Sequence, residues 1–472
     1  MDKDMDGGRG RGCLYGAADP GIFQHRPDSE VICIRILHIA AHMGGGAGKA
    51  IAGIALLGAR QFGEEHRILL LEKPEKDGFV EMCRADGVSV SMWSGDVQAL
   101  TWADVIVVSW WNHPAMARFL REFPRCGVRL ALWCHVNGCH YPHLPFSLAR
   151  AFDKVLFTSP YSLRNPHWTA EEQREIEGRS EIVYGMGDFQ PQEIAPRMPA
   201  GGRETFCIGY VGTLNYGKLH PDFVTFCKAV CDHVPEARFV MVGDRNGGLE
   251  QDIRSAGLWE RFSFPGYITD VPAMLRTFDV FGYLLNPEHY GTTENVLLEA
   301  MACAVPPVVL RQNVEQYIVP PEKEFTVRSP EEYGQRIADL YRRPDAAERL
   351  GRRAREHVLR QYGAKENAER FRKACLQVSG EEKRQRDFSF LGDTPWQWFL
   401  SGLDRRQRDR FQDAAAGPGD AAELLRNCPP IFREERKSSL RHFAAIYPED
   451  EVLSRLCKLM EEQHYGRDQA KL

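Results

Sequence analysis

The stretch GTTENVLLEAMA, residues 291–302, places hydroxyl, amide and carboxylate groups beside an apolar helical pattern. The predicted helix NVLLEAMA is apolar on nearly every side, so we expect it to be buried, with Thr292 or Thr293 as its cap. Glu299 is its only charge, and a buried carboxylate needs a hydroxyl or a cation as partner. Amide groups at the start of such a helix favour an anion. The element therefore predicts an anion site and a carboxylate suited to two ribose hydroxyls.

A second stretch, HMGGGAGKA at residues 42–50, places glycines between two apolar runs. Glycine loops between a strand and a helix often bind phosphate through backbone amides. A triphosphate-binding loop needs glycine where Met43 stands and a hydroxyl where Ala50 stands, and a dinucleotide loop needs glycine at Lys49. We therefore expect a loop whose backbone passes close to a diphosphate held mainly by another domain, with Lys49 as a surface residue at the helix start.

The elements that position these stretches are short apolar runs that alternate with helical patterns. They are predicted as strands at 35–40, 104–110, 128–136 and 153–159, and in a second series at 206–214, 237–244, 261–267, 279–285 and 305–310. Continuous apolar strands alternating with helices indicate parallel sheets covered on both faces. The predicted fold is α/β, with two Rossmann-like domains facing across a cleft and ligands at the carboxyl ends of the strands.

The domain boundaries follow from changes in composition. The polar, Pro- and Gly-rich segment 187–204 separates the two series, and the charged segment SGEEKRQRD precedes a last helical region. The predicted divisions are a disordered lead-in at 1–34, an N-terminal domain at 35–190, a C-terminal domain at 205–378 and a helical appendage at 385–472. Two roles stay open for the appendage: docking a partner, or forming part of an acceptor site.

Composition narrows the protein class. The chain has 472 residues, 43% hydrophobic and 26% charged, with a net charge of -5, which gives no reason to expect nucleic acid as a partner. Its 13 cysteines are scattered and odd in number, as is typical of free thiols in a reducing compartment. It has neither the roughly 20 consecutive apolar residues of a membrane span nor a signal peptide, so we expect a cytoplasmic protein.

One segment resembles a known family. ENVLLEAMACAVPPVV, from Glu294 onward, is similar to the donor-binding signature of GT-B glycosyltransferases of family 4 (glycosyl transferases group 1), a retaining type. Further similar segments stand in the family's order: KVLFTSPYSLRN, EIVYGMGDF, GYVGTLNYGKLHPDF, ARFVMVGD and FPGYITDVPAMLRTFDVFGYLLNP. The resemblance covers roughly residues 35–378 and implies donor binding by the second domain and acceptor binding by the first.

The resemblance also implies roles for single residues. It places Glu299 at the donor ribose, Lys218 at the donor diphosphate, and His135 near the transferred sugar. Lys218, His135 and Glu294 are thereby the predicted catalytic residues. The other predicted donor contacts are the base-binding turn and the loops that approach the diphosphate and sugar: Gly45, Gly46, Thr213, Tyr267, Ile268, Gly291, Thr292, Thr293 and Glu294.

Two positions depart from the family pattern. Gly291 stands eight residues before Glu299, where the family has its first glutamate. Three alternatives are open: Glu294 or Glu288 supplies this carboxylate from a shifted position, or the sugar contact differs. Thr213 stands where the family usually has an arginine, so the phosphate site is expected to depend on Lys218 and on amides.

A metal site is the less favoured interpretation of two segments. His135, Cys139, His140 and His143 lie close together in CHVNGCHYPH, but their spacing fits no common pattern of paired zinc ligands. We predict a cleft-lining loop there. The Asp-x-Asp at residues 4–6 lies in the lead-in, and Asp188 is expected in a turn, so no metal site is predicted.

The predicted activity is transfer of a hexosyl-type sugar from a nucleotide-diphosphate sugar, with retention and without metal or cofactor. The expected acceptor is a glycan or lipid-linked glycan of a surface polysaccharide, which would bring the protein to the inner membrane face. The alternative is a non-catalytic GT-B protein that binds a sugar or nucleotide. No oligomeric state is predicted.

Overall fold

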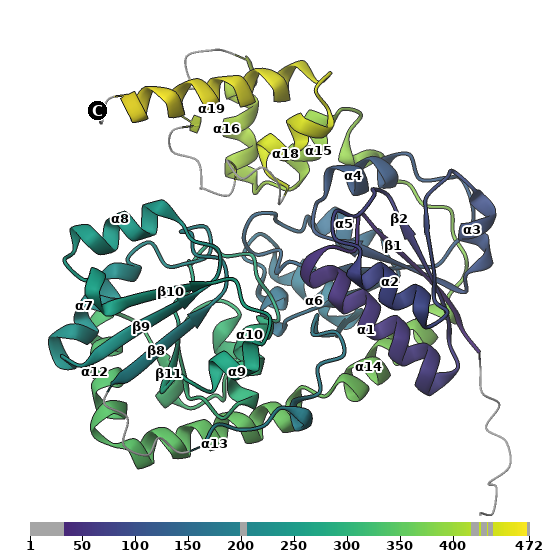
Figure 1. The fold of residues 1–472 in the computed structure, drawn as a ribbon. Coiled ribbons are helices and arrows are strands. Elements are labelled where there is room, and N and C mark those ends of the chain that lie inside the picture. Colours follow the sequence, from purple (N-terminus) through teal and green to yellow (C-terminus); the bar gives the residue numbers. More distant parts are fainter. Residues whose placement is uncertain (1–32, 199–204, 417–423, 426–431, 433–437, 470–472) are drawn as a thin grey trace, which may run out of the picture. The chain divides into compact units, whose positions relative to one another are not determined.

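The computed structural model describes residues 33–198, 205–416, 424–425, 432 and 438–469. Nearly all of the predicted lead-in at 1–34, including the Asp-x-Asp motif, lies outside this part of the chain. The described residues form two parallel sheets with helices on both faces and a group of C-terminal helices (Figure 1). The predicted α/β class with two Rossmann-like domains is confirmed.

The first domain contains a seven-stranded parallel sheet in the order β3-β2-β1-β4-β5-β6-β7. Its strands are β1 (Arg35–Ala40), β2 (Glu65–Leu70), β3 (Ser89–Met92), β4 (Val105–Trp110), β5 (Leu130–Cys134), β6 (Lys154–Phe157) and β7 (Ser180–Ile182). The helices that cover it are α1 (Gly45–Phe62), α2 (Gly78–Ala85), α3 (Val97–Trp102), α4 (Pro114–Arg121), α5 (Phe146–Arg150) and α6 (Ala170–Gly178).

The second domain contains a six-stranded parallel sheet in the order β10-β9-β8-β11-β12-β13. Its strands are β8 (Phe206–Val211), β9 (Ala237–Val242), β10 (Phe262–Gly266), β11 (Val280–Tyr283), β12 (Pro307–Leu310) and β13 (Thr326–Val327). Its helices are α7 (Phe223–His233), α8 (Gly247–Ser255), α9 (Val271–Leu275), α10 (Asn295–Ala302), α11 (Glu315–Ile318), α12 (Pro330–Arg342) and α13 (Pro344–Gln361).

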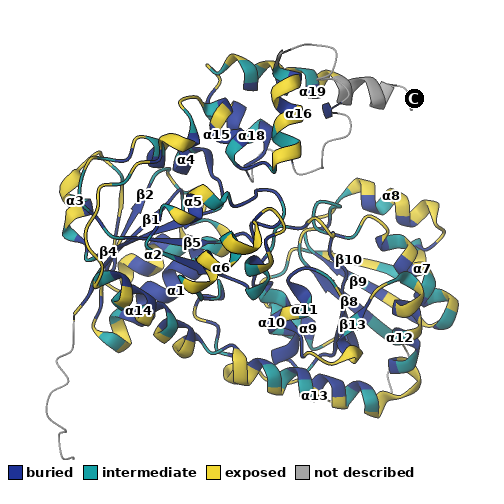
Figure 2. Ribbon diagram, turned by 180° about the vertical axis from the view of Figure 1, so that it is seen from behind, coloured by how far each residue is buried: buried dark blue, intermediate teal, exposed yellow. Residues whose placement is uncertain are grey.

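Every predicted strand is present, and the four unpredicted ones, β2, β3, β7 and β13, lie toward the sheet edges. β2 and β3 mix exposed and buried residues, β7 is only half-buried and β13 has two residues, so none of the four forms a continuous apolar run. Central strands such as β4 and β5 are buried throughout (Figure 2). Continuous apolar runs therefore mark the strands covered on both faces, whereas of the rim strands only β10 was predicted.

The chain crosses back to the first domain after α13. Helix α14 (Ala364–Ser379) packs against α1, and its apolar face lies in the same core as β1 and β2. Asn367 also bonds the backbone of Tyr184 in both directions, at 2.8 and 2.9 Å. The structure thus differs from the predicted C-terminal domain of 205–378, because an amphipathic pattern shows that a helix is buried on one face but not which sheet covers that face.

The last helices share a core with the first domain. They are α15 (Pro395–Ser401), α16 (Arg405–Ala416), α18 (Leu440–Ile446) and α19 (Glu451–Gln469). α15 and α18 both pack on α4, and their buried aromatic side chains join the apolar cluster of strands β4 to β6. Tyr447, just after α18, donates a hydrogen bond from its hydroxyl to the carbonyl of Pro114 at 3.0 Å. This region is therefore built onto the first domain.

Two further observations concern the described residues as a whole. Every cysteine there is a free thiol. None of the described helices has the length and apolar character that crossing a bilayer requires.

Candidate functional site

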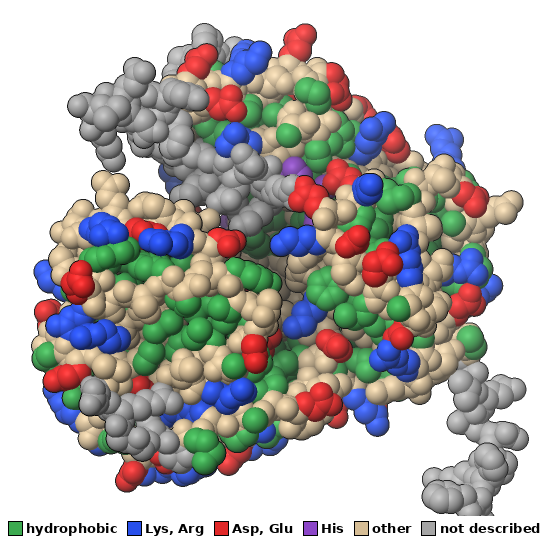
Figure 3. Space-filling view, viewed as in Figure 1, with side chains coloured by type: hydrophobic (Ala, Val, Ile, Leu, Met, Phe, Trp, Pro, Cys, Tyr) green, Lys and Arg blue, Asp and Glu red, His purple; other side chains and the backbone are tan. Residues whose placement is uncertain are grey.

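A cavity of about 1560 Å³ opens where the carboxyl ends of both sheets face each other. Its walls come from the start of α1, the loops after β2, β4 and β8, the start of α10, and helices α18 and α19. Figure 3 shows the surface hollowed between the two domains. Parallel α/β sheets bind ligands at this end because loops and helix N-termini converge there.

The start of α10 differs from its predicted form. Glu294, with φ 44°, is the residue at the helix cap, and no side chain caps the helix. The prediction that Thr292 or Thr293 caps it is wrong, because the Thr293 hydroxyl is used elsewhere: it donates to the Thr158 carbonyl at 3.1 Å and accepts from the Gly185 amide at 2.8 Å. Both partners belong to the first domain, so this loop joins the two domains.

The uncapped helix start leaves backbone amides available. In the described part of the chain no acceptor is found for the amides of Asn295 and Val296, and both residues line the cavity. Free amides and the positive end of the helix dipole favour an anion at this position.

Lys218 and Glu294 form the most buried ion pair of the cavity wall. The Lys218 Nζ lies 3.2 Å from Glu294 Oε2, and the side chains are 22% and 5% exposed. The Tyr283 hydroxyl donates to the same carboxylate at 2.5 Å, and His289 Nδ1 lies 3.5 Å away. Burial raises the pKa of Glu294, but Lys218, His289 and the Tyr283 hydrogen bond outweigh burial and lower it to about 2. Glu294 is therefore a carboxylate at neutral pH and orients the lysine.

The backbone around Lys218 is held as firmly as its side chain. Its amide donates to the Asn215 carbonyl at 3.0 Å, and its carbonyl accepts from the Asn286 amide at 2.7 Å. The loop after β8 thereby brings the ammonium group to the cavity, where Thr213 also lies.

Gly291 is glycine because Glu294 fills the space beside it. A Cβ atom on Gly291 would lie 1.9 Å from Glu294 Oε1. Glu288, the other candidate for the shifted carboxylate, is exposed and does not line the cavity. Of the two candidates, only Glu294 lines the cavity.

Glu315 is a buried carboxyl behind this pair that sequence reasoning missed. It stands at the start of α11 and is 1% exposed. Burial raises its pKa to about 8, and the charge of Glu294 acts in the same direction. Glu315 is thus mainly neutral at pH 7, and Glu294 carries the negative charge of the two.

Glu299 has a cationic partner from the other domain. Lys49 Nζ, on α1, lies 3.7 Å from Glu299 Oε1, with side chains 29% and 20% exposed. Burial raises the pKa of Glu299 above its ordinary value, against the effect of the lysine charge. Lys49 was expected as a surface residue, and the structure corrects this. Helix α1 packs tightly on the turn at Gly187, where a Cβ atom on Gly187 would lie 2.7 Å from Lys49 Cγ. A contact between domains leaves no local signal in sequence.

His135 is a neutral hydrogen-bonding group. Its Nε2 lies 3.2 Å from the Ser109 hydroxyl, and its ring contacts those of Trp133 and Trp111. Burial lowers its pKa to about 3. The residue lines the cavity and is uncharged at neutral pH, and its predicted place near the transferred sugar stays a prediction.

The remaining predicted donor contacts fall into two groups. Gly45 and Gly46 line the cavity, and a Cβ atom on either would meet nothing within 4 Å. Gly291, Thr292 and Thr293 line it as well. Tyr267 and Ile268 do not: the Tyr267 side chain is 78% exposed, and neither residue is part of the cavity wall.

The residues of the zinc alternative point in different directions. His140 Nε2 lies 3.1 Å from both the Tyr161 hydroxyl and Asn313 Oδ1. His143 lies 3.7 Å from Asp404, in the C-terminal region. Within the described residues, no group of three or more metal-ligating side chains is found.

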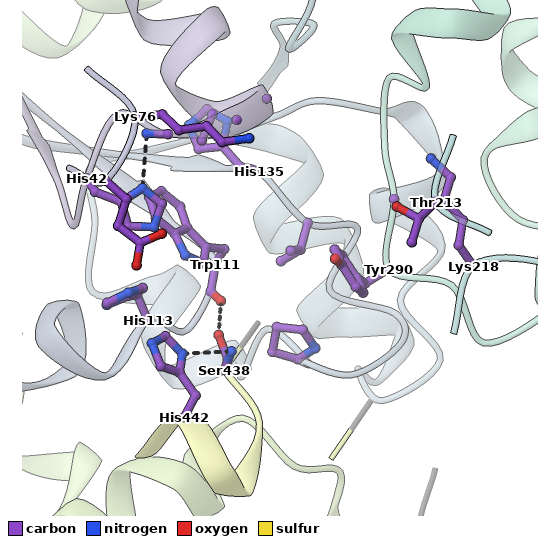
Figure 4. Close-up of a pocket in the computed structure, with 18 of the residues that line it drawn as sticks. His42, Lys76, Trp111, His113, His135, Thr213, Lys218, Tyr290, Ser438 and His442 are labelled. Carbon is purple, nitrogen blue, oxygen red and sulfur yellow. Dashed lines mark hydrogen bonds between the residues drawn. The ribbon is translucent and has the colours of Figure 1, made fainter. Parts of the chain in front are cut away.

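Four aromatic residues form a cluster on the first-domain side of the cavity. The ring centroids of His42 and Trp111 are 5.4 Å apart, and those of His113 and His442 of α18 are 4.7 Å apart (Figure 4). Across the cavity stand Thr213 and Lys218 (Figure 4). These four residues come from three distant segments, and no motif in the sequence connects them.

Known proteins resemble this chain in both sequence and fold. The model of the family "Glycosyl transferases group 1" matches residues 199–357. A Bacillus subtilis (strain 168) protein described as "Putative glycosyltransferase EpsD" is 24% identical over 199 residues, which are 39% of this chain and 51% of that protein. The chain thus matches about half the length of this curated relative.

Two solved structures show the likeness of fold. HepE from Anabaena, solved in complex with UDP, superposes with a TM-score of 0.56 at 15% identity, covering 73% of this chain and 100% of that one. Sucrose-phosphate synthase from Thermosynechococcus elongatus gives a TM-score of 0.54 at 16% identity, covering 73% of this chain and 99% of that one. The chain therefore has the GT-B fold, and its residues 199–357 match the glycosyl transferases group 1 model.

Proposed function

We propose that the protein is a glycosyltransferase that moves a sugar from a nucleotide-diphosphate sugar to an acceptor. The single observation that carries this proposal is the arrangement at the start of α10, where free amides and Lys218 face one cavity with Glu299. A diphosphate fits the cationic and amide groups, and ribose hydroxyls fit Glu299. HepE, a neighbour in fold, binds UDP, so UDP-sugars are the first donors to test.

Bond cleavage would leave negative charge on the diphosphate while the sugar becomes oxocarbenium-like. Lys218, held by Glu294, and the amides of Asn295 and Val296 lie where they would stabilise that charge. These groups supply positive charge of the required kind, so the proposed reaction needs no metal or cofactor.

The proposed stereochemistry is retention, as in the group 1 type that the sequence resembles. Glu294 is engaged by Lys218 and Tyr283, and Glu299 by Lys49, so neither is placed as a free nucleophile. We therefore favour attack from the face of the leaving group, with the departing phosphate accepting the acceptor's proton. Neutral His135 would contribute a hydrogen bond to the sugar.

The acceptor in this proposal is a glycan or lipid-linked glycan bound against the first domain. A lipid-linked acceptor would bring the protein to the inner membrane face. The support for this class is the family resemblance.

The test is Glu299→Ala, assayed for transfer and hydrolysis with a panel of UDP-sugars. We expect loss of activity by at least 100-fold with an unchanged unfolding temperature. Glu288→Ala is the matched control, because this exposed carboxylate is in the same segment but outside the cavity. Near-normal turnover by Glu299→Ala would overturn the proposal.

The second candidate is a non-catalytic binding protein, favoured by the glycine at position 291 in place of the family's first glutamate. It predicts that the wild-type protein binds UDP or a UDP-sugar, measured by calorimetry, but neither hydrolyses nor transfers with any acceptor.

A further inference from the structure

The C-terminal helices supply one wall of the cavity, opposite the donor residues. Arg441 and His442 of α18 and Cys457, Lys458 and Glu461 of α19 all line it. The loop after β2 contributes Lys73 and Lys76 to the same cavity. The HepE and sucrose-phosphate synthase structures are covered almost completely by 73% of this chain, so about a quarter of the chain has no counterpart in either.

This wall is fixed to the first domain by buried contacts. Ser438, which is 1% exposed, donates its hydroxyl to the Trp111 carbonyl at 2.7 Å and its amide to His442 Nδ1 at 3.2 Å (Figure 4). The Tyr141 hydroxyl donates to the Ser438 carbonyl. The wall is therefore anchored at the residue that begins it, beside the aromatic cluster.

The wall and the loop after β2 carry three lysines that have no ion-pair partner among the described residues. In the described part of the chain, Lys73, Lys76 and Lys458 have no carboxylate within 4.0 Å, whereas Lys218 and Lys49 are both paired with glutamates. Arg441 lies 3.6 Å from Glu461. The loop after β2 also carries the carboxylates of Glu72 and Glu75, and Glu72 lies 3.4 Å from His113. Burial lowers the pKa of His113, so it adds no positive charge at neutral pH.

We propose that α18 and α19 complete an acceptor subsite for a saccharide that bears an anionic group. The sugar would lie against Trp111 and the histidines, and the anion would meet Lys458, Lys73 and Lys76. The acceptor role in this inference rests on the proposed function. Binding of the saccharide does not, because it can be measured without a donor. Aromatic rings offer an apolar face to a sugar, and unpaired lysines at a cavity mouth attract anions.

The test compares probes that differ only in charge. Binding of p-nitrophenyl glucuronide, p-nitrophenyl glucoside, glucose 6-phosphate and glucose to the full chain is measured by calorimetry at low salt. We expect the two anionic probes to bind at least fivefold more tightly than their neutral counterparts. The gain in affinity of each anionic probe over its own neutral counterpart then separates a carboxylate ligand from a phosphate ligand.

The variant Lys458→Met tests whether the wall formed by α18 and α19 is responsible for the charge preference. It should remove most of the charge preference and leave UDP binding unchanged, while Lys228→Met, an exposed lysine of α7, should change neither. Equal binding of charged and neutral probes by the wild type, or an unchanged preference in Lys458→Met, would overturn the inference. If UDP and UDP-sugars fail to bind while the charge preference is seen, the proposed function fails and the subsite stands.

Discussion

Two lysine–glutamate pairs whose glutamates line the same cavity differ in almost every physical respect. Lys218–Glu294 lies within one domain, at 3.2 Å, and a tyrosine hydroxyl supports it. Lys49–Glu299 spans two domains, at 3.7 Å, and is more exposed. The pKa of Glu294 is lowered, whereas that of Glu299 is raised. The first pair is built into the fold, and the second is available to be exchanged for a ligand.

The difference follows from where the chain places each partner. Lys218 and Glu294 belong to loops after neighbouring strands of one sheet, β8 and β11, so their separation is set by that sheet. Lys49 reaches Glu299 from the first domain, so this distance depends on how the domains meet. Hydroxyls of a ribose can replace a long, partly exposed contact at low cost, since such pairs contribute little to stability.

The largest effect is expected from breaking the internal pair. Lys218→Met leaves Glu294 charged and buried, so we expect a loss of stability of about 3 kcal/mol and of turnover by about 100- to 1000-fold. Denaturant unfolding and transfer assays measure the two. Lys218→Arg, which keeps the charge, should recover most of the stability, and a Lys218→Met protein as stable as wild type would contradict this view of the pair.

The two glutamates should respond to pH with opposite signs. The pKa of Glu294 is about 2 in the folded protein, below its ordinary 4.5, so its stabilisation is present at pH 7 and is lost as pH falls from about 4.5 to 2. The contribution is on the order of 3 kcal/mol. The raised pKa of Glu299 means that acidification through that pKa instead adds stability.

Unfolding free energies of wild type, Glu294→Gln and Glu299→Gln at several pH values between 3 and 7 test this. The acid-induced loss should be smaller in Glu294→Gln and larger in Glu299→Gln. Identical profiles for the two variants would remove the distinction between the pairs.

A moderate effect is expected from breaking the Lys49–Glu299 pair between the domains. Lys49→Met should lower stability by no more than about 1 kcal/mol, because the contact is long and partly exposed. Without the lysine the pKa of Glu299 rises further, so UDP affinity should fall about 3- to 10-fold at the lower of two pH values and less at the higher. Calorimetry at both pH values measures this, and Lys49→Arg should behave like wild type; an equal loss at both pH values would show direct contact with the ligand instead.

The smallest effect is expected outside the cavity wall. The Tyr267 side chain is 78% exposed, so Tyr267→Ala should change stability by less than about 0.5 kcal/mol. UDP affinity should change by at most about threefold. A larger loss of UDP affinity would show that the turn predicted to hold the base closes onto the ligand.

Much of the fold could be predicted from the sequence. Buried parallel strands are continuous apolar runs, so the central strands of both sheets were identifiable, as were Glu299 and Lys218 through the family resemblance. Strands β2, β3, β7 and β13 and the domain to which α14 belongs were not, because short or half-exposed strands and one-sided helices do not identify their neighbours.

The site was less predictable than the fold. Gly291 is a departure that only the structure explains, by placing the Glu294 carboxylate where a side chain at 291 would begin. The Lys49–Glu299 contact joins residues 250 positions apart across two domains. The aromatic cluster with His442 depends on a C-terminal region whose packing on α4 has no sequence motif.

The return of α14 to the first domain has a mechanical consequence. The chain connects the two domains twice, once between β7 and β8 and once between α13 and α14. Two covalent connections define one axis, so the second domain can rotate about the line through them, and rotation about other axes is restricted. Any movement of the two domains about both connections therefore keeps the two walls of the cavity in the same alignment.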